Sequence, residues 1–384
     1  MIHLSPTKPM FWELNEPDPR GGRWELRLEG APSGSAPWGR WSYYLGAPSR
    51  WIKCDAKTLV TTLVEPRGRV RKWTDPLEAL RWLTLELRER PGAGLGTTGA
   101  PPFKGGWVGW LSYDVGRLFE ELPAVARDDL DLPLFEFTYH ETVLAREGHQ
   151  RAGPGVTIEL SDSAGNMRET LPAPAGLAVG NSTQDAPLHS TFARDAYIAA
   201  VARTIEYVGA GDVFQVNLSQ RFTAPLRESP ASIYARLRRA SPAWFGAYLA
   251  YDDHALLSTS PELFLRVTPD PTTGKRHVLT RPIKGTRPRG SGKDTELRDS
   301  LKDQAELNMI VDLERNDLGR VCEIGSVLVS EARAIETHPT IIHGVASVEG
   351  VLRNDVTFVD LLRATFPGGS VTGAPKIRAM QILE

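Results

Sequence analysis

The chain has 384 residues, of which 41% are hydrophobic and 24% are charged, a balance typical of globular proteins. Its 45 basic and 47 acidic residues give a net charge of −2, which argues against the basic surface that nucleic-acid-binding proteins present. The sequence shows no apolar run long enough to span a membrane, no signal-peptide pattern, and only two cysteines, which lack metal-ligand spacing. We therefore expect a cytoplasmic protein. The length of the chain predicts two or three domains.

The first part of the chain is rich in tryptophan, since nine of the ten tryptophans lie within the first 110 residues. We therefore expect a distinct N-terminal region over residues 1–145. Within it, Asp75 as cap and Pro76 at the first helical position predict the start of a helix. The glycine-punctuated aromatic run at 103–117 predicts a strand followed by a turn. Residues 146–190 are rich in Gly, Pro, Ala, Ser and Thr, and this composition predicts a linker with at most one hairpin.

The second part, residues 191–384, has clearer hydrophobic patterns. Apolar residues at helical spacing predict a helix over 198–208. The alternation in VFQVNLSQRF, residues 213–222, predicts a strand. FGAYLAYDDHALLSTSPELFLRV, residues 245–267, predicts two strands around a polar turn, and HVLTRPIKGT, residues 277–286, predicts a strand that runs into a turn.

Two further helices are predicted toward the end of the chain. DTELRDSLKDQAELNMIVDLERNDLGRV, residues 294–321, has the pattern of one long amphipathic helix. TFVDLLRATF, residues 357–366, predicts a short helix in which Thr357 and Asp360 have the spacing of a capping box. Strands interrupted by helices without regular alternation predict an α+β fold with mainly antiparallel sheets.

Four residues are candidates for chemistry. Lys284 lies in RPIKGTRPRG and is either a solvated cation or a reagent. Glu262 follows a proline in STSPELF, where most glutamates are solvated. Glu306 falls on or beside the apolar face of the long helix, where a carboxylate is either paired with a cation or bound to a metal, and pairing is the commoner case. His343 is flanked by apolar residues, and a hydrogen-bonded core histidine is its default interpretation.

Five motifs occur in a fixed order and together carry a family resemblance. They are GDVFQVNLSQRF, STSPELF, RPIKGTRPRG, DQAELNMIVDLERNDLGRV and FPGGSVTGAPKIRAMQI. This set resembles the chorismate-utilising family, which includes anthranilate synthase component I, aminodeoxychorismate synthase component I, isochorismate synthases and salicylate synthases. PFKGGWVGWLSYDVGR resembles the family's N-terminal half. The resemblance implies an anthranilate synthase component I-like fold of two stacked antiparallel β-sheets with helices outside, and a chorismate-binding region over residues 191–384.

The lysine of PIKGT helps to distinguish between the reactions that members of this family catalyse. Anthranilate synthases usually have alanine at this position, whereas aminodeoxychorismate synthases commonly have lysine, as this chain does. The resemblance therefore implies amination of chorismate at C4, giving 4-amino-4-deoxychorismate for p-aminobenzoate and folate biosynthesis. Anthranilate synthase component I, which makes the precursor of tryptophan, is one alternative. An inactive scaffold or partner subunit is another.

The same resemblance assigns roles to individual residues. Lys284 would attack C2 of chorismate while Glu262, as general acid, protonates the departing 4-hydroxyl group. This attack needs a neutral amine, which partial burial and the neighbouring Arg281, Arg287 and Arg289 would favour.

The resemblance further implies a metal, substrate contacts and a partner. Mg²⁺ would neutralise the ring carboxylate, with Glu306 among its ligands. Gly285 and Thr286 match a turn that contacts the substrate, and His343 matches a histidine that lies beside the ring. A glutamine amidotransferase subunit would supply ammonia, because Cys54 and Cys322 lack the context of a glutaminase nucleophile.

Relatives also hold tryptophan in a pocket between N-terminal strands. RWSYYLGAPSRW lies in the corresponding region, so Ser42, Ser49 and Arg50 are candidate contacts, together with Phe245. Plain strand packing is the alternative, and it is slightly preferred.

The family pattern continues beyond the position that matches Glu384. In relatives that continuation supplies a substrate-binding arginine, a glycine-rich carboxylate-binding turn and further magnesium-binding glutamates. We therefore expect the 384 residues by themselves to bind chorismate poorly, to turn it over slowly and to aggregate.

Overall fold

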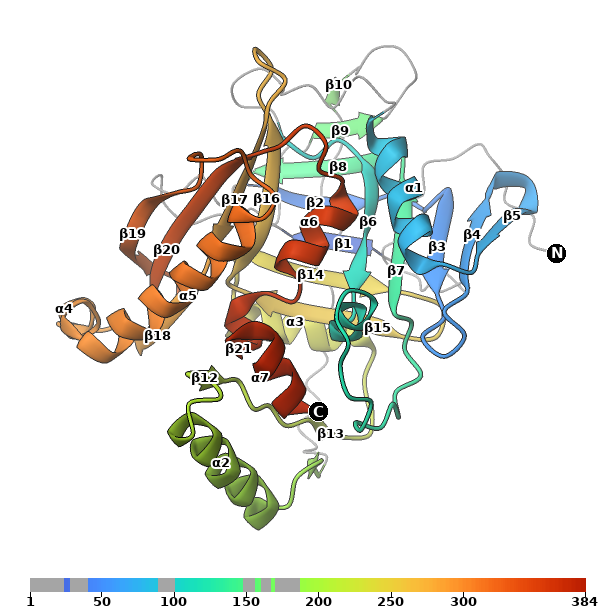
Figure 1. The fold of residues 1–384 in the computed structure, drawn as a ribbon. Coiled ribbons are helices and arrows are strands. Elements are labelled where there is room, and N and C mark those ends of the chain that lie inside the picture. Colours follow the sequence, from blue (N-terminus) through green and yellow to red (C-terminus); the bar gives the residue numbers. More distant parts are fainter. Residues whose placement is uncertain (1–23, 28–40, 89–100, 148–155, 160–166, 170–186) are drawn as a thin grey trace.

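The computed structural model describes residues 24–27, 41–88, 101–147, 156–159, 167–169 and 187–384. In these ranges the strands form three larger antiparallel sheets and two two-stranded sheets, with helices packed against them (Figure 1). The expected α+β class with antiparallel sheets is confirmed. Among the described helices, none combines the length and the apolar character needed to cross a membrane.

A seven-stranded sheet joins the two parts of the chain. Its order is β10-β9-β8-β2-β1-β14-β15, and β14 from the second part pairs with β1 from the first. A hairpin, β9–β10, lies within the residues expected to form a linker. The strands are β1 (Trp24–Arg27), β2 (Trp41–Leu45), β8 (Thr142–Glu147), β9 (Val156–Glu159), β10 (Met167–Glu169), β14 (Phe245–Ala250) and β15 (Ala255–Ser260).

A five-stranded sheet, β5-β4-β3-β7-β6, lies beside it in the N-terminal region. Helix α1 (Pro76–Arg88) begins where Asp75 Oδ1 accepts a hydrogen bond from the Leu77 N–H at 2.8 Å, which confirms the predicted cap. Leu80 and Leu83 of this helix pack against the buried face of the sheet. The strands are β3 (Arg50–Cys54), β4 (Thr61–Glu65), β5 (Arg69–Trp73), β6 (Gly106–Leu111) and β7 (Phe135–His140).

These two sheets share one hydrophobic cluster. Tyr43 of β2 and Val143 of β8 pack in it with Val108 and Trp110 of β6. Because each sheet contributes one apolar face, the two faces exclude water together, which is the driving force for stacking sheets.

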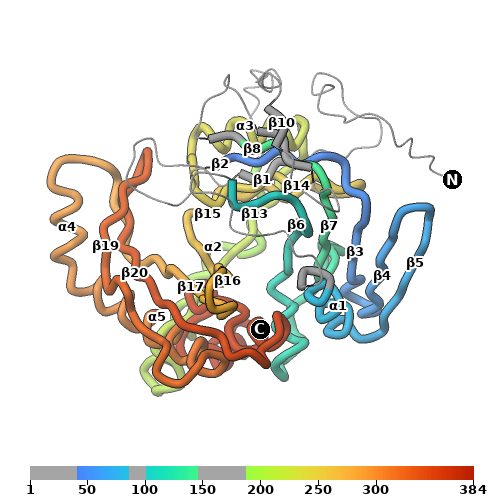
Figure 2. The backbone as a smooth tube through the Cα atoms, turned by 90° about the horizontal axis from the view of Figure 1, so that it is seen from above, coloured from blue at the N-terminus to red at the C-terminus, as the bar shows by residue number. Residues whose placement is uncertain are grey.

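A second five-stranded sheet forms the other side of the molecule. Strand β20 pairs with β17, β18 and β19, and β16 extends the sheet beyond β17. Seen from above, β19 and β20 lie opposite β3, β4 and β5 (Figure 2). The strands are β16 (Leu263–Pro269), β17 (Arg276–Arg281), β18 (Ile283–Pro288), β19 (Leu328–Thr337) and β20 (Ile341–Leu352).

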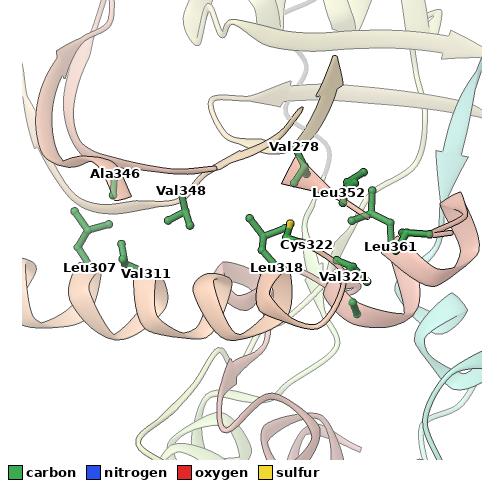
Figure 3. Packing of buried hydrophobic residues seen from close by; sticks show 12 residues of the cluster. Val278, Leu307, Val311, Leu318, Val321, Cys322, Ala346, Val348, Leu352 and Leu361 are labelled. Carbon is green, nitrogen blue, oxygen red and sulfur yellow. The ribbon is translucent and has the colours of Figure 1, made fainter. Parts of the chain in front are cut away.

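Helix α5 (Leu301–Gly319) covers one face of this sheet. Leu307, Val311 and Leu318 project from the helix toward Ala346 and Val348 of β20 (Figure 3). Leu307 and Leu318 are completely buried, so the contact removes a continuous apolar face from water.

The remaining elements connect these layers. Helix α6 has the predicted capping box between Thr357 and Asp360. The two-residue strands β12 and β21 pair with each other, as do β11 and β13. The elements are α2 (Arg194–Gly209), α3 (Pro230–Ala240), α4 (Lys293–Asp299), α6 (Phe358–Thr365), α7 (Lys376–Leu383), β11 (His189–Ser190), β12 (Gln215–Val216), β13 (Phe222–Thr223) and β21 (Gly373–Ala374), with 3-10 helices η1 (Pro66–Gly68), η2 (Tyr113–Leu118) and η3 (Gly369–Val371).

Three local predictions were wrong, each for a physical reason. The predicted long helix is broken at Ser300, whose hydroxyl instead caps α5 by accepting from the Asp303 N–H at 3.3 Å. Residues 213–222 are not one strand, because their two ends pair with different partners, β21 and β11. The segment PIKGT is not a turn: after Pro282 it continues as β18, because β20 offers a further edge for pairing.

Leu307 provides a test of the packing between α5 and β20. Replacing Leu307 by alanine should lower the free energy of unfolding by about 2–5 kcal/mol, because it leaves a cavity in a closed contact. Leu301, on the same helix, is 80% exposed, and its replacement by alanine should change stability by no more than about 0.5 kcal/mol. Urea denaturation measures both, and equal losses would contradict the packing described.

Candidate active site

Strand β18 positions Lys284, and it does so through an irregular stretch of pairing. Ile283 lies opposite Val345 and Thr286 opposite His343, with a register shift between the two pairs. Irregularities of this kind re-aim a side chain and are common beside active sites. Lys284 is half-buried at this shift.

Gly285 allows β18 to lie directly against the helices. Its φ is +84°, and a Cβ at this position would lie 2.7 Å from Leu297 Cδ1 and 2.9 Å from Asp303 Cβ. Any other residue would therefore meet both a strained backbone and a steric clash. This explains physically why glycine follows the lysine.

Glu262 lies within electrostatic range of Lys284. Burial raises the pKa of the Glu262 carboxyl, while the nearby Ser370 hydroxyl, the charge of Lys284 and the N–H of Ile283 act in the opposite direction. The structure thus brings together an amine and a carboxyl whose protonated form is favoured by desolvation, and a general acid requires such a carboxyl.

His343 and Thr286 form the next part of the site. Thr286 Oγ1 lies 2.9 Å from His343 Nδ1, in a hydrogen bond whose direction depends on the tautomer. Burial lowers the pKa of His343, so the imidazole is neutral at physiological pH. Its Nε2 is buried and, among the described residues, has no hydrogen-bond partner. A polar atom placed in this way is available to a ligand.

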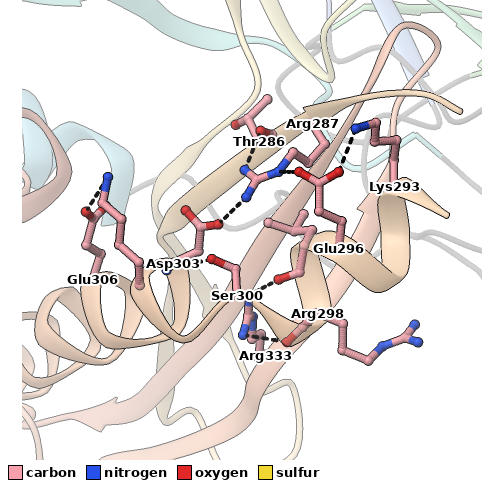
Figure 4. Close-up of polar contacts among 11 residues, drawn as sticks. Thr286, Arg287, Lys293, Glu296, Arg298, Ser300, Asp303, Glu306 and Arg333 are labelled. Atoms are coloured by element: carbon pink, nitrogen blue, oxygen red, sulfur yellow. Dashed lines mark hydrogen bonds and ion pairs between the residues drawn. The ribbon is translucent and has the colours of Figure 1, made fainter.

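Two of the three arginines around Lys284, Arg281 and Arg287, are paired with carboxylates rather than being the free charges expected from the sequence. Arg287 forms ion pairs with Glu296 at 2.7 Å and Asp303 at 2.9 Å (Figure 4). Arg281 pairs with Glu336 at 2.5 Å. The charges of these two arginines are therefore compensated, and the charge of Lys284 acts on the carboxyl of Glu262.

Glu306 is paired with a cation, as a carboxylate at its position usually is. Its Oε1 lies 3.6 Å from Lys302 Nζ one helical turn away, and its side chain is 39% exposed. No group of three or more acidic, histidine or cysteine side chains in the described ranges is arranged to hold a metal ion. Since Mg²⁺ takes about six oxygen ligands, the described residues do not by themselves fit the predicted metal.

Sequence reasoning missed a second group of polar residues, on α5 and around η3. Glu314 is 2% exposed, and its Oε1 accepts a hydrogen bond from the Gly369 N–H at 3.1 Å. Asp317 forms a buried ion pair with Lys376 at the start of α7. A signal was present, because Glu314 lies four residues after Ile310, on the apolar face of the helix.

The candidate tryptophan contacts lie in two different sheets. The guanidinium of Arg50 in β3 lies 4.1 Å from the ring centre of Tyr139 and 5.1 Å from that of Trp107, and Ser49 donates to Glu141 at 3.0 Å. Ser42 and Phe245 belong to the seven-stranded sheet. These contacts are those of packed strands, and the tryptophan pocket stays a prediction.

A comparison of Gly285 with Gly274 separates the effect of close packing on stability from the effect of positive φ, because both glycines have positive φ and only Gly285 is closely packed. Gly285→Ala should lower the free energy of unfolding by about 2–4 kcal/mol, because positive φ and overpacking both add cost. Gly274 has φ +68°, but a Cβ added there would meet no atom within 4 Å, so Gly274→Ala should cost only about 1–2 kcal/mol. Chemical denaturation of both variants checks the difference. Equal costs would show that β18 does not press against α4 and α5.

Comparison with known proteins places this site in a family. The family model described as chorismate binding enzyme matches residues 50–384. Anthranilate synthase component 1 of Thermus thermophilus is 39% identical over 299 residues, covering 74% of this chain and 63% of that protein, so the chain spans less than two thirds of this relative. Aminodeoxychorismate synthase component 1 of Bacillus subtilis is 35% identical over 370 residues, covering 91% of this chain and 75% of that protein. The crystal structure of anthranilate synthase component I from Streptococcus pneumoniae superimposes with a TM-score of 0.67 at 26% identity, covering 92% of this chain and 78% of that one. The chain therefore belongs to the chorismate-binding enzyme family.

Proposed function

We propose that this protein aminates chorismate at C4, as the chorismate-converting component of an aminodeoxychorismate synthase. The observation that carries the proposal is Lys284 on β18, whose charge acts on the buried carboxyl of Glu262. A nucleophile and a proton donor are the two groups that the proposed chemistry requires. Relatives named aminodeoxychorismate synthase component 1, such as that of Klebsiella aerogenes at 39% identity over 289 residues, support it.

The proposed reaction has two displacement steps. The Lys284 amine forms a bond to C2 of chorismate, the ring double bond shifts, and the C4 hydroxyl leaves as water with a proton from Glu262. Ammonia then forms a bond to C4 and gives one proton back to the Glu262 carboxylate, the double bond shifts back, and Lys284 is expelled and regains its free amine. The balance is chorismate plus ammonia giving 4-amino-4-deoxychorismate plus water. The neutral His343, held by Thr286, can orient a polar substituent of the ring.

Anthranilate synthase chemistry is the second candidate. It is favoured by the relative from Thermus thermophilus, which is as similar over the matched residues as the aminodeoxychorismate synthase of Klebsiella aerogenes. In that reaction ammonia itself attacks C2, so a lysine next to the ring has no covalent role. Lys284 is the reason for preferring C4 amination.

Magnesium and an ammonia-supplying partner are further parts of the proposal. Glu306 is the described carboxylate that we assign to Mg²⁺, which would neutralise the substrate carboxylate when bound. Its remaining ligands are not provided by the described residues, so the mechanism above uses side chains of the chain alone. A glutamine amidotransferase subunit would supply ammonia in the folate pathway.

The reaction product decides between the two chemistries. With chorismate, ammonia and magnesium the protein should form 4-amino-4-deoxychorismate, and Lys284→Ala should reduce its formation by about a hundredfold or more, because the nucleophile is lost. Lys293→Ala, which removes an exposed lysine of α4 paired with Glu296, is the matched control and should leave rate and product unchanged. Chromatography of the products and anthranilate fluorescence provide the measurement. Anthranilate as the product of the unmodified protein would refute the proposal.

The source of nitrogen tests the partner. Without a glutaminase subunit, free ammonia should support turnover and glutamine should not. At fixed total ammonium the rate should rise with pH by about tenfold per unit below the pKa of ammonium, because the neutral NH₃ is the nucleophile. Coupled assays with each nitrogen donor measure this. Glutamine-dependent turnover by the purified chain alone would remove the need for a partner.

A further inference from the structure

His338 is a second buried histidine at the candidate site, and the reaction above gives it no role. It is 3% exposed and directly follows β19, where its N–H donates to the carbonyl of Ile341 at 2.8 Å. Burial, with smaller contributions from the charges of His343 and Arg281, lowers the pKa of His338 to about 4. The ring is therefore neutral at physiological pH and does not repel its neighbours.

The pairing of β19 with β20 brings His338 next to His343. Glu336 lies opposite His343 in this pair, and a residue two positions further along a strand points to the same face. His338 is thus the diagonal neighbour of His343, a position within reach of aromatic side chains. The ring centres of the two histidines lie 4.9 Å apart with their planes at 75°, which is the edge-to-face arrangement that aromatic rings prefer.

Trp244 also packs against His338. The two ring centres lie 4.2 Å apart with their planes tilted by 34°, and Trp244 is 4% exposed. Trp244 directly precedes β14 of the seven-stranded sheet, whereas both histidines belong to the hairpin of β19 and β20. Trp244, His338 and His343 therefore form one aromatic cluster, which connects the seven-stranded sheet to the sheet that carries Lys284.

The turn that carries His338 is held by the chain that follows Lys284. Arg289 comes directly after β18, and its N–H donates to the carbonyl of Thr340 at 3.1 Å. The Nη1 of the same arginine donates to the carbonyl of Pro339 at 3.4 Å. Contacts to main-chain carbonyls thus fix the position of His338 relative to the candidate nucleophile.

The imidazole of His343 needs a second contact to keep one orientation. Its Nδ1 lies 2.9 Å from Thr286 Oγ1, but the χ2 torsion of histidine has a broad energy minimum, so the ring can tilt about a single hydrogen bond. The ring of His338 occupies the space beside the imidazole and removes this freedom. The direction of His343 Nε2, which has no partner among the described residues, depends on both contacts.

We propose that His338 is a positioning residue: together with Trp244 it holds the imidazole of His343 in the orientation in which Nε2 can contact the substrate. The proposal deepens the proposed function and rests on its assignment of His343 to the substrate. It does not depend on whether the substrate is aminated at C4 or at C2.

A double-mutant cycle tests whether His338 acts through His343. His338→Ala should lower kcat/KM for chorismate consumption, with ammonia and magnesium present, by about ten- to a hundredfold, because a misplaced orienting group loses most of its effect. In the His343→Ala background the same substitution should change kcat/KM by no more than about twofold, since the ring that it positions is gone. Equal losses in both backgrounds would show a purely structural role and overturn the proposal. Anthranilate as the product would refute only the proposed reaction, because consumption is followed whatever product forms.

His338→Phe separates the ring of His338 from its nitrogen atoms. Phenylalanine keeps an aromatic ring beside His343, and Nε2 of His338 has no hydrogen-bond partner to lose in the part of the chain that the structure describes. This variant should therefore retain kcat/KM within about threefold. His277→Ala, which removes an exposed histidine of β17 in the same sheet, is the control and should leave kcat/KM unchanged. A loss for His338→Phe as large as that for His338→Ala would mean that the ring is not what positions His343, and the proposal would fall.

NMR of the protein with isotope-labelled histidine tests the same contact without turnover. The imidazole signals of His343, assigned by their loss in His343→Ala, should form one sharp set in the unmodified protein and in His338→Phe. In His338→Ala they should broaden or split, because the ring gains further orientations. One unchanged sharp set in His338→Ala would overturn the proposal. Broadening in a protein that consumes no chorismate would support the positioning and refute only the proposed reaction.

Discussion

The close approach of β18 to α4 and α5 at Gly285 is the constraint on which the site depends. The strand is paired with β20 on one side and lies so close to Leu297 and Asp303 that no Cβ fits between them. The apolar contact between α5 and β20 holds the helix in place. Successive residues of a strand point to opposite faces. The packing of Gly285 against α4 and α5 on one face of β18 therefore determines the position of Lys284 on the other face.

Desolvation gives the site its chemical character. The carboxyls of Glu262 and Glu314 both have raised pKa values, chiefly because they are buried. A carboxyl whose folded-state pKa is raised destabilises the protein as pH rises through that value, since the folded form binds more protons than the unfolded form below it. These two carboxyls thus lower the stability of this protein at neutral pH, and perturbed groups of this kind are common at functional sites.

Local features of the fold could be predicted from the sequence, whereas long-range partners could not. The helix caps at Asp75 and Thr357 involve residues two or three positions apart, so the residue types at these positions are enough to predict the caps. The break at Ser300 was missed because an amphipathic pattern runs through it, whereas the contacts at the bend include long-range ones such as the pairing of Arg287 with α4 and α5.

The candidate site could be predicted only in part, because its residues are far apart in the sequence. Glu262, Lys284 and His343 were found through a family resemblance, since no periodicity shows that a carboxyl 22 residues before a lysine lies beside it. The ion pairs that neutralise Arg281 and Arg287 depend on tertiary contacts. Glu314 had a detectable signal, an acid on the apolar face of a helix, but the meaning of that signal depends on Gly369, 55 residues later.

The most direct test of the central claim, that Lys284 is a nucleophile, is mass spectrometry of the protein with chorismate in the absence of ammonia and glutamine. Peptides are analysed after rapid quenching and again after ammonia is added. The account predicts that the peptide containing Lys284 gains the mass of chorismate less one water, and that ammonia discharges it. Chorismate consumption in the presence of ammonia without any adduct on this peptide, or with an adduct on another lysine, would contradict it.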